Sequence, residues 1–88
     1  MTATAPLTAV YPGTFDPMTL GHEDLMRRGS RLFDRLILAV AAGHHKRTMF
    51  TIAERLSMAS EIASPYRNVE VMAFRGLLSD FVREIGGK

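Results

Sequence analysis

The segment Arg35–Ala41 constrains the fold of this chain more than any other, because a single arginine is followed by an unbroken apolar run, Leu36-Ile37-Leu38-Ala39-Val40-Ala41. A strand that is apolar on both faces has to be covered on both, which is typical of a parallel sheet with helices on either side. Two more apolar segments predict strands at residues 7–11 and at Val69–Phe74. The chain is therefore expected to build a layered α/β fold.

Helical patterns separate these strands. Apolar residues at helical spacing predict a first helix over residues 21–32. Its expected apolar face consists of Leu25, Met26, Gly29, Leu32 and Phe33. Thr51 and Glu54 have the spacing of a capping box and predict the start of a second helix, which ends before the next proline. A third helix is predicted over residues 76–85, closed by Gly86-Gly87.

The order strand-helix-strand-helix-strand-helix predicts one half of a Rossmann-like doubly wound parallel sheet. In such a half the strands lie in the order 3-2-1, and the first strand has a free edge that a fourth strand would fill. The third helix is the crossover that would deliver this strand, yet the sequence stops at Lys88. We therefore expect residues 1–88 to form a single domain that is truncated at its C-terminal side.

Composition excludes several classes of protein. The 88 residues include no cysteine, so disulfides and thiolate metal sites are excluded, and a hydrophobic content of 47% favours a packed core. No apolar run approaches the roughly 20 residues of a membrane span, and residues 1–6 lack the features of a secretory signal, so we expect a cytoplasmic protein with no membrane partner. The basic residues are scattered, and the first helix mixes both signs of charge, so its surface is interpreted as a solvated face and not as a nucleic-acid site. These charged residues are Glu23, Asp24, Arg27, Arg28 and Arg31.

The turn between the first strand and the first helix carries the residues that suit phosphate chemistry. Gly13 permits close approach of the backbone to a ligand, Thr14 adds a hydroxyl beside it, and Gly21 removes a side chain where a ligand would sit. His22 falls in the first turn of the helix, where it could donate a hydrogen bond to phosphate oxygens alongside the positive end of the helix dipole. The alternative is an ordinary strand-to-helix turn, capped by Asp16, with His22 at the surface.

The sequence around this turn resembles a known family. Thr19-Leu20-Gly21-His22 resembles the T/H-x-G-H signature of the nucleotidylyltransferase superfamily, and Tyr11-Pro12-Gly13-Thr14-Phe15-Asp16-Pro17 resembles the opening of bacterial phosphopantetheine adenylyltransferases. The resemblance covers nearly all of the chain after Pro6 and makes residues 1–88 a single nucleotidylyltransferase domain. It continues in Leu32-Phe33-Asp34, Lys46, Met49-Phe50-Thr51, Glu54-Arg55, Asn68-Val69-Glu70-Val71 and Gly76-Leu77-Leu78.

The resemblance implies an enzyme that transfers the adenylyl group of ATP to 4′-phosphopantetheine, with Mg²⁺, giving dephospho-coenzyme A and pyrophosphate. His22 would be the catalytic residue, binding ATP and stabilising charge at the α-phosphate. Thr14 would contact the attacking phosphate, and Thr14 and Phe15 would touch ATP. Lys46 would pair with the attacking phosphate, and Leu78 would line the pantetheine channel. The family also implies a homohexamer, and it implies no side chain as a metal ligand.

Several of these residues have a plainer interpretation. Lys46 lies in a polar loop, where a lysine is usually solvated, and Leu78 lies on the apolar stripe of the third helix, where it is equally a candidate core residue. His44 and His45 are adjacent, so their side chains diverge, and no carboxylate stands near them in the sequence. We interpret these two histidines as solvated loop residues and not as metal ligands.

Two other functions stay open. Other nucleotidylyltransferases, such as those for nicotinate mononucleotide or glycerol phosphate, usually carry histidine at the position of Thr19. The chain also departs from the phosphopantetheine family at Thr48 and Ala53, and it has no counterpart of the later R-G-L-R and serine-rich segments that complete the ATP and substrate pockets. The second alternative is therefore a catalytically incomplete nucleotide-binding fragment.

Overall fold

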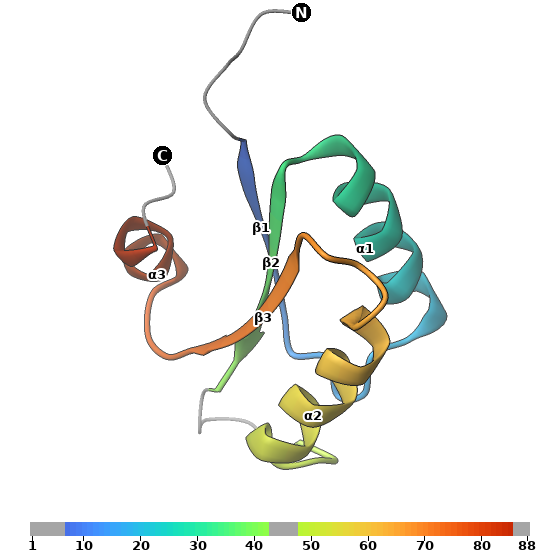
Figure 1. Ribbon diagram of the computed structural model, residues 1–88. Helices are drawn as coiled ribbons and strands as arrows, with labels where there is room; N and C mark the ends of the chain where they lie inside the picture. The colour runs from blue at the N-terminus through green and yellow to red at the C-terminus, as the bar shows by residue number, and fades with distance from the viewer. Residues whose placement is uncertain (1–6, 43–47, 86–88) are drawn as a thin grey trace, which may run out of the picture.

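The computed structural model describes residues 7–42 and 48–85 of the chain, and within them it confirms the predicted alternation of strands and helices (Figure 1). The elements are β1 (Thr8–Gly13), α1 (Leu20–Leu32), β2 (Arg35–Ala41), α2 (Ile52–Ala63), β3 (Val69–Phe74) and α3 (Leu78–Glu84). The predicted bounds of β2 and β3 are correct. β1 extends two residues beyond the predicted Tyr11, because Pro12 and Gly13 still pair with β2 opposite Ala39 and Val40.

The three strands form one parallel sheet in which β2 lies between β1 and β3, as predicted. The register aligns Tyr11 of β1 with Leu38 of β2, and Leu38 with Val71 of β3. Helices α1 and α2 cover one face of the sheet, and α3 lies against the other face (Figure 1). Two successive right-handed crossovers explain why α1 and α2 share a face.

The core lies on both sides of β2. Leu36, Leu38 and Val40 point toward α1 and α2 and join Met26 in one buried cluster. Ile37 and Ala39 point the other way and pack beneath Phe81 of α3. None of these β2 side chains is more than 3% exposed, and burying a large aliphatic side chain contributes roughly 1.5–3 kcal/mol. This strand therefore anchors both layers of helices.

Two of the three helices begin with a capping box. At α2 the Thr51 hydroxyl accepts the Glu54 N–H at 3.1 Å, and the Glu54 carboxylate accepts the Thr51 N–H at 2.9 Å, which confirms the predicted start. At α1 the capping residue is Thr19. The N-cap of α3, Leu77, makes no side-chain hydrogen bond. Since the strands are parallel, all three helices begin near the same edge of the sheet.

The predicted apolar face of α1 is only partly buried. Met26 is fully buried and Gly29 packs against Leu36, but Leu25 and Leu32 are 55% and 72% exposed. Neither of these two leucines belongs to the buried clusters of the described residues. The solvated charged face is confirmed by exposed ion pairs within α1. Arg27 and Arg28 both pair with Asp24, at 2.6 and 3.1 Å.

A bidentate ion pair joins the amino ends of β2 and β3. Arg35 Nε and Nη2 donate to the two carboxylate oxygens of Glu70 at 2.6 and 2.9 Å. These hydrogen bonds hold the pKa of the Glu70 carboxyl below its usual range. A carboxyl of this kind stabilises the fold at a pH above its unfolded-state pKa, and the contribution is lost as the pH falls through the folded-state pKa.

We expect Glu70→Gln to lower the free energy of unfolding at pH 7, by a modest amount because both side chains are partly exposed. The difference between the two proteins should shrink as the pH falls below the ordinary carboxyl range. Urea unfolding followed by circular dichroism at several pH values measures it. A difference that grows on acidification would contradict this assignment.

Candidate functional site

The predicted site residues that the structure describes lie at the carboxyl edge of the sheet. Thr14 and Phe15 directly follow β1, and His22 lies in the first turn of α1. Ligands of open α/β sheets bind outside the carboxyl ends of the strands, where the connecting loops and helix N-termini gather. The structure therefore places these three residues together at the edge where this fold binds ligands.

Phe15 forms the floor of the turn. Its backbone has a φ of 49°, and the residue as a whole is 2% exposed. The ring lies edge-on to Tyr11, with centroids 5.4 Å apart, and edge-on to His22 at 5.0 Å. The aromatic contacts hold the imidazole of His22 over the turn.

The Phe15 ring leaves no room for a Cβ atom at Gly13, a requirement that stands beside the predicted approach of a ligand. A Cβ atom at Gly13 would lie 2.9 Å from the tip of the Phe15 ring, closer than real Cβ contacts come. The position above Gly21 is open by comparison, with one atom at 3.7 Å, the hydroxyl oxygen of Thr19. The space beside Gly13 is therefore filled by the protein itself, whereas Gly21 leaves room at the helix start.

Gly13→Ala should destabilise the fold by about 1–3 kcal/mol, since the buried Phe15 ring must move to accept the methyl group. Thermal and urea unfolding measure the loss. Gly21→Ala is the matched control, and it should cost less because its Cβ meets no close atom. Equal losses in the two variants would show that the ring does not set the requirement at Gly13.

His22 occupies the third position of α1 and closes an unusual capping box with Thr19. The Thr19 hydroxyl lies 3.3 Å from the His22 backbone N–H, which donates to it, and the Thr19 backbone N–H donates to His22 Nδ1 at 3.0 Å. A backbone N–H can only donate, so Nδ1 must be the unprotonated nitrogen of the neutral ring. The ring proton then resides on Nε2, which becomes a donor for a ligand.

Thr19→Val should lower stability by about 1 kcal/mol, because it removes the hydroxyl that caps α1. It should also loosen the imidazole, since the hydroxyl additionally contacts Nδ1 at 3.1 Å, while the backbone N–H that donates to Nδ1 is kept. The ¹⁵N chemical shifts of the His22 ring report the tautomer directly. Thr19→Ser keeps the hydroxyl and should keep the stability, and both variants keep the backbone N–H and should keep the Nε2–H form. A tautomer mixture in either variant would contradict the assignment of Nδ1 as the acceptor.

Asp16 does not cap α1, contrary to the alternative interpretation of the turn. Its carboxylate accepts the backbone N–H groups of Met49 and Phe50, the latter at 2.8 Å. Both groups belong to the segment just before α2, 33 and 34 residues further along the chain. Asp16 therefore ties the β1–α1 turn to the entrance of α2.

The role of Arg55 was not predicted from the sequence. This arginine of α2 is 3% exposed, and its guanidinium donates to the carbonyl oxygens of Thr14, Ala41 and Phe50. A signal was available, because Arg55 falls three residues after Ile52 and four before Ala59 on the apolar stripe of the helix. A cation on a buried stripe has to find partners, but the sequence does not say which.

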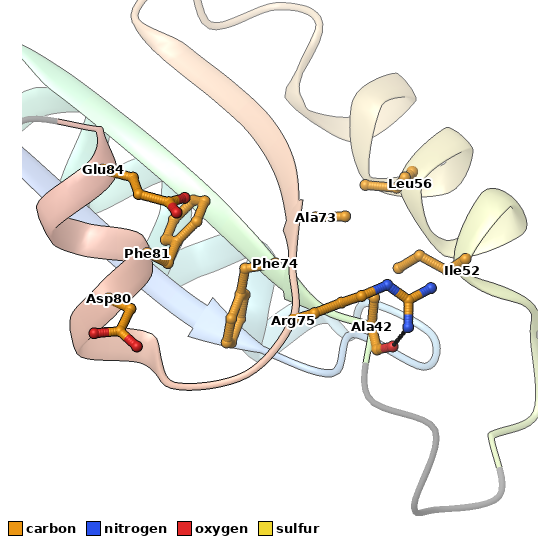
Figure 2. A pocket seen from close by; sticks show the side chains of 9 residues that line it. All are labelled: Ala42, Ile52, Leu56, Ala73, Phe74, Arg75, Asp80, Phe81 and Glu84. Atoms are coloured by element: carbon orange, nitrogen blue, oxygen red, sulfur yellow. Dashed lines mark hydrogen bonds between the residues drawn. The ribbon is translucent and has the colours of Figure 1, made fainter.

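A cleft of about 560 Å³ lies across the outer edge of β3, between α2 and α3 (Figure 2). Its walls are mostly apolar, with charged side chains at the rim. The lining residues are Ala42, Ile52, Leu56, Ala73, Phe74, Arg75, Asp80, Phe81 and Glu84. Arg75 donates to the carbonyl oxygen of Ala42 at 2.9 Å, so it closes the end of the cleft toward β2.

Leu78, the first residue of α3, does not line this cleft and is 36% exposed. It is therefore no core residue within the described structure, and its place in a substrate channel stays a prediction. Lys46, His44 and His45 lie outside the described residues. Within residues 7–42 and 48–85, no three histidine or carboxylate side chains gather as a metal site, and no helix is long and apolar enough to cross a membrane.

Comparison with known proteins identifies the class to which this site belongs. Residues 10–87 match the model of the cytidylyltransferase-like family, and the chain is a member of that family. Two solved structures of NadR protein share the fold at 21% and 22% sequence identity. One, in complex with NAD and AMP-PNP, aligns with a TM-score of 0.72 over 83% of this chain and 21% of its own. The other, in complex with NR, gives a TM-score of 0.69 over 82% and 22%.

Three curated proteins with sequences similar to this chain are named phosphopantetheine adenylyltransferase. The protein of Bordetella avium is 56% identical over 82 residues, which are 93% of this chain and 49% of the relative. That of Acidovorax sp. is 54% identical over 94% of this chain and 50% of the relative. That of Paraburkholderia phymatum is 57% identical over 88% and 46%. The chain thus spans about half the length of the curated relatives it matches.

Proposed function

We propose that this chain forms the nucleotide-binding half of an enzyme that transfers the adenylyl group of ATP to 4′-phosphopantetheine, releasing pyrophosphate and giving dephospho-coenzyme A. One observation carries the proposal. The capping box at α1 orients His22 with Nε2–H as its donor, at the start of a helix and at the same edge of the sheet as Thr14. Relatives above 50% identity bear the name of this activity.

The chemistry asks the protein to position two anions and to stabilise charge. The phosphate of 4′-phosphopantetheine attacks the α-phosphorus of ATP, an O–P bond forms, and the bond to pyrophosphate breaks. His22 would donate from Nε2 to an oxygen of the α-phosphate as negative charge develops there, aided by the positive end of α1. Thr14 would contact the attacking phosphate, together with Lys46, and Thr14 and Phe15 would also contact ATP. Leu78 would border the pantetheine arm.

Magnesium would supply charge neutralisation on the phosphates of ATP. The described residues do not gather a set of ligands for it. In the β1–α1 turn, both carboxylate oxygens of Asp16 already accept backbone N–H groups from the segment before α2. We infer that the ion arrives bound to the nucleotide. We further propose a cytoplasmic homo-oligomer, a homohexamer as the family implies.

The rival acceptors fit less well. Thr19 occupies the position where nucleotidylyltransferases for nicotinate mononucleotide or glycerol phosphate usually carry histidine, and here its backbone N–H and hydroxyl both serve His22. The other alternative is a module that binds nucleotide without turnover. Calorimetry with ATP on the 88-residue chain, set beside turnover by the complete product of its gene, separates a binding fragment from an enzyme half.

The decisive test is turnover by the complete product of the gene that encodes these 88 residues. With ATP, Mg²⁺ and 4′-phosphopantetheine it should release pyrophosphate and form dephospho-coenzyme A. His22→Asn keeps a short polar side chain at the helix start but removes Nε2–H, and should lower kcat by about 10²–10³-fold with a smaller effect on KM.

Arg31→Gln on the exposed face of α1 is the control and should leave kcat unchanged. No product from 4′-phosphopantetheine, with turnover of another phosphorylated acceptor, would refute the proposed substrate. An undiminished kcat in His22→Asn would refute the role of His22.

A further inference from the structure

We propose that Arg55 is the positioning residue of this site, in that its buried guanidinium fixes the β1–α1 turn against the end of β2 and the entrance of α2. Its effect on catalysis rests on the proposed function, whereas its effect on the geometry of the turn does not. Arg55 touches none of the proposed reacting atoms and acts through Thr14.

The hydrogen bonds of Arg55 reach three separate segments of chain. Nη1 donates to the carbonyl oxygen of Thr14 at 3.0 Å and to that of Ala41 at 2.8 Å, and Nε donates to that of Phe50 at 3.1 Å. The three carbonyls come from the turn after β1, the last residue of β2 and the segment before α2. One rigid planar group therefore sets the relative positions of three backbone segments at the carboxyl edge.

The burial of Arg55 makes its hydrogen bonds energetically important. The residue is 3% exposed, and within the described chain its guanidinium is hydrogen-bonded to carbonyl oxygens and is paired with no carboxylate. Removing an unpaired cation from water is costly, and carbonyl dipoles recover only part of that cost. The three carbonyls are held as a set, because any one that moves away leaves a buried N–H group unsatisfied.

Asp16 binds the same segment before α2 that Arg55 binds, but from the β1–α1 turn. It accepts the N–H of Phe50 at 2.8 Å, while Arg55 binds the carbonyl oxygen of the same residue. Residue 50 is thus held at both of its backbone polar groups, by the turn and by the helix. Because Thr14 directly precedes Phe15, whose ring supports the imidazole of His22, a shift of the Thr14 carbonyl changes the distance between the two proposed phosphate contacts.

Arg55→Lys is the informative variant. Lysine keeps the positive charge, but its single nitrogen cannot span the directions that Nε and Nη1 cover. Arg35→Lys is the matched control, because Arg35 is also a bidentate arginine of this sheet, but it binds Glu70 at the opposite, amino end. Both variants are made in the complete gene product, and kcat and KM are compared after correction for the folded fraction.

We expect Arg55→Lys to lower kcat about 10- to 100-fold, because a small misplacement of the turn is costly in catalysis, and Arg35→Lys to leave it nearly unchanged. Amide NMR signals of residues 14–16 and 49–51 and the ring signals of His22 should shift in Arg55→Lys and stay in place in Arg35→Lys. Asp16→Asn, which weakens the same network, should shift the same signals and serves if Arg55→Lys does not fold.

An unchanged kcat in Arg55→Lys, or a loss equal to that in Arg35→Lys, would overturn the proposal. So would NMR changes spread evenly over the sheet in the Arg55 or Asp16 variants. If the wild-type enzyme does not adenylate 4′-phosphopantetheine, the proposed function fails alone, since the NMR comparison still tests how Arg55 holds the turn.

Discussion

The burial of β2 on both faces is the constraint on which the rest of this structure depends. Leu38 and Val40 require α1 and α2 on one side, and Ile37 and Ala39 require α3 on the other. A strand covered by helices on both faces pairs most readily with parallel neighbours, because each helix returns the chain to the same end of the sheet. That return brings the strand ends and helix starts together at one edge, so the position of the site follows from the core.

The loops at the carboxyl edge of the sheet have no regular ladder of backbone hydrogen bonds, so their backbone groups need other partners. Polar side chains supply them here: Asp16 binds two N–H groups of the α2 entrance, while Arg55 and Arg75 bind consecutive carbonyls at the end of β2. These bonds satisfy backbone groups that would otherwise lack partners near the core. The same side chains fix the positions of the loops that contain the candidate site. The hydrogen bonds that satisfy these backbone groups therefore also set the geometry of that site.

Local patterns predicted the elements well, because the signals that define them are local. The apolar run of β2 and the capping box at Thr51 were sufficient to place their elements. The errors concern side chains whose partners are distant in sequence. Asp16, which one interpretation made the cap of the first helix, binds N–H groups more than 30 residues away. The three carbonyls of Arg55 belong to three segments that only the folded sheet brings together.

The two capping boxes differ in one residue, and this difference bears on the proposed role of His22. At α2 the third residue is Glu54, whose carboxylate accepts the N–H of Thr51 and complements the helix dipole. At α1 the same position holds His22, which accepts the equivalent N–H through Nδ1. A carboxylate there would repel a phosphate, whereas a neutral imidazole still caps the helix and presents a second nitrogen as a donor. Exchanging one residue type thus keeps the cap and leaves the positive end of α1 open to an anion.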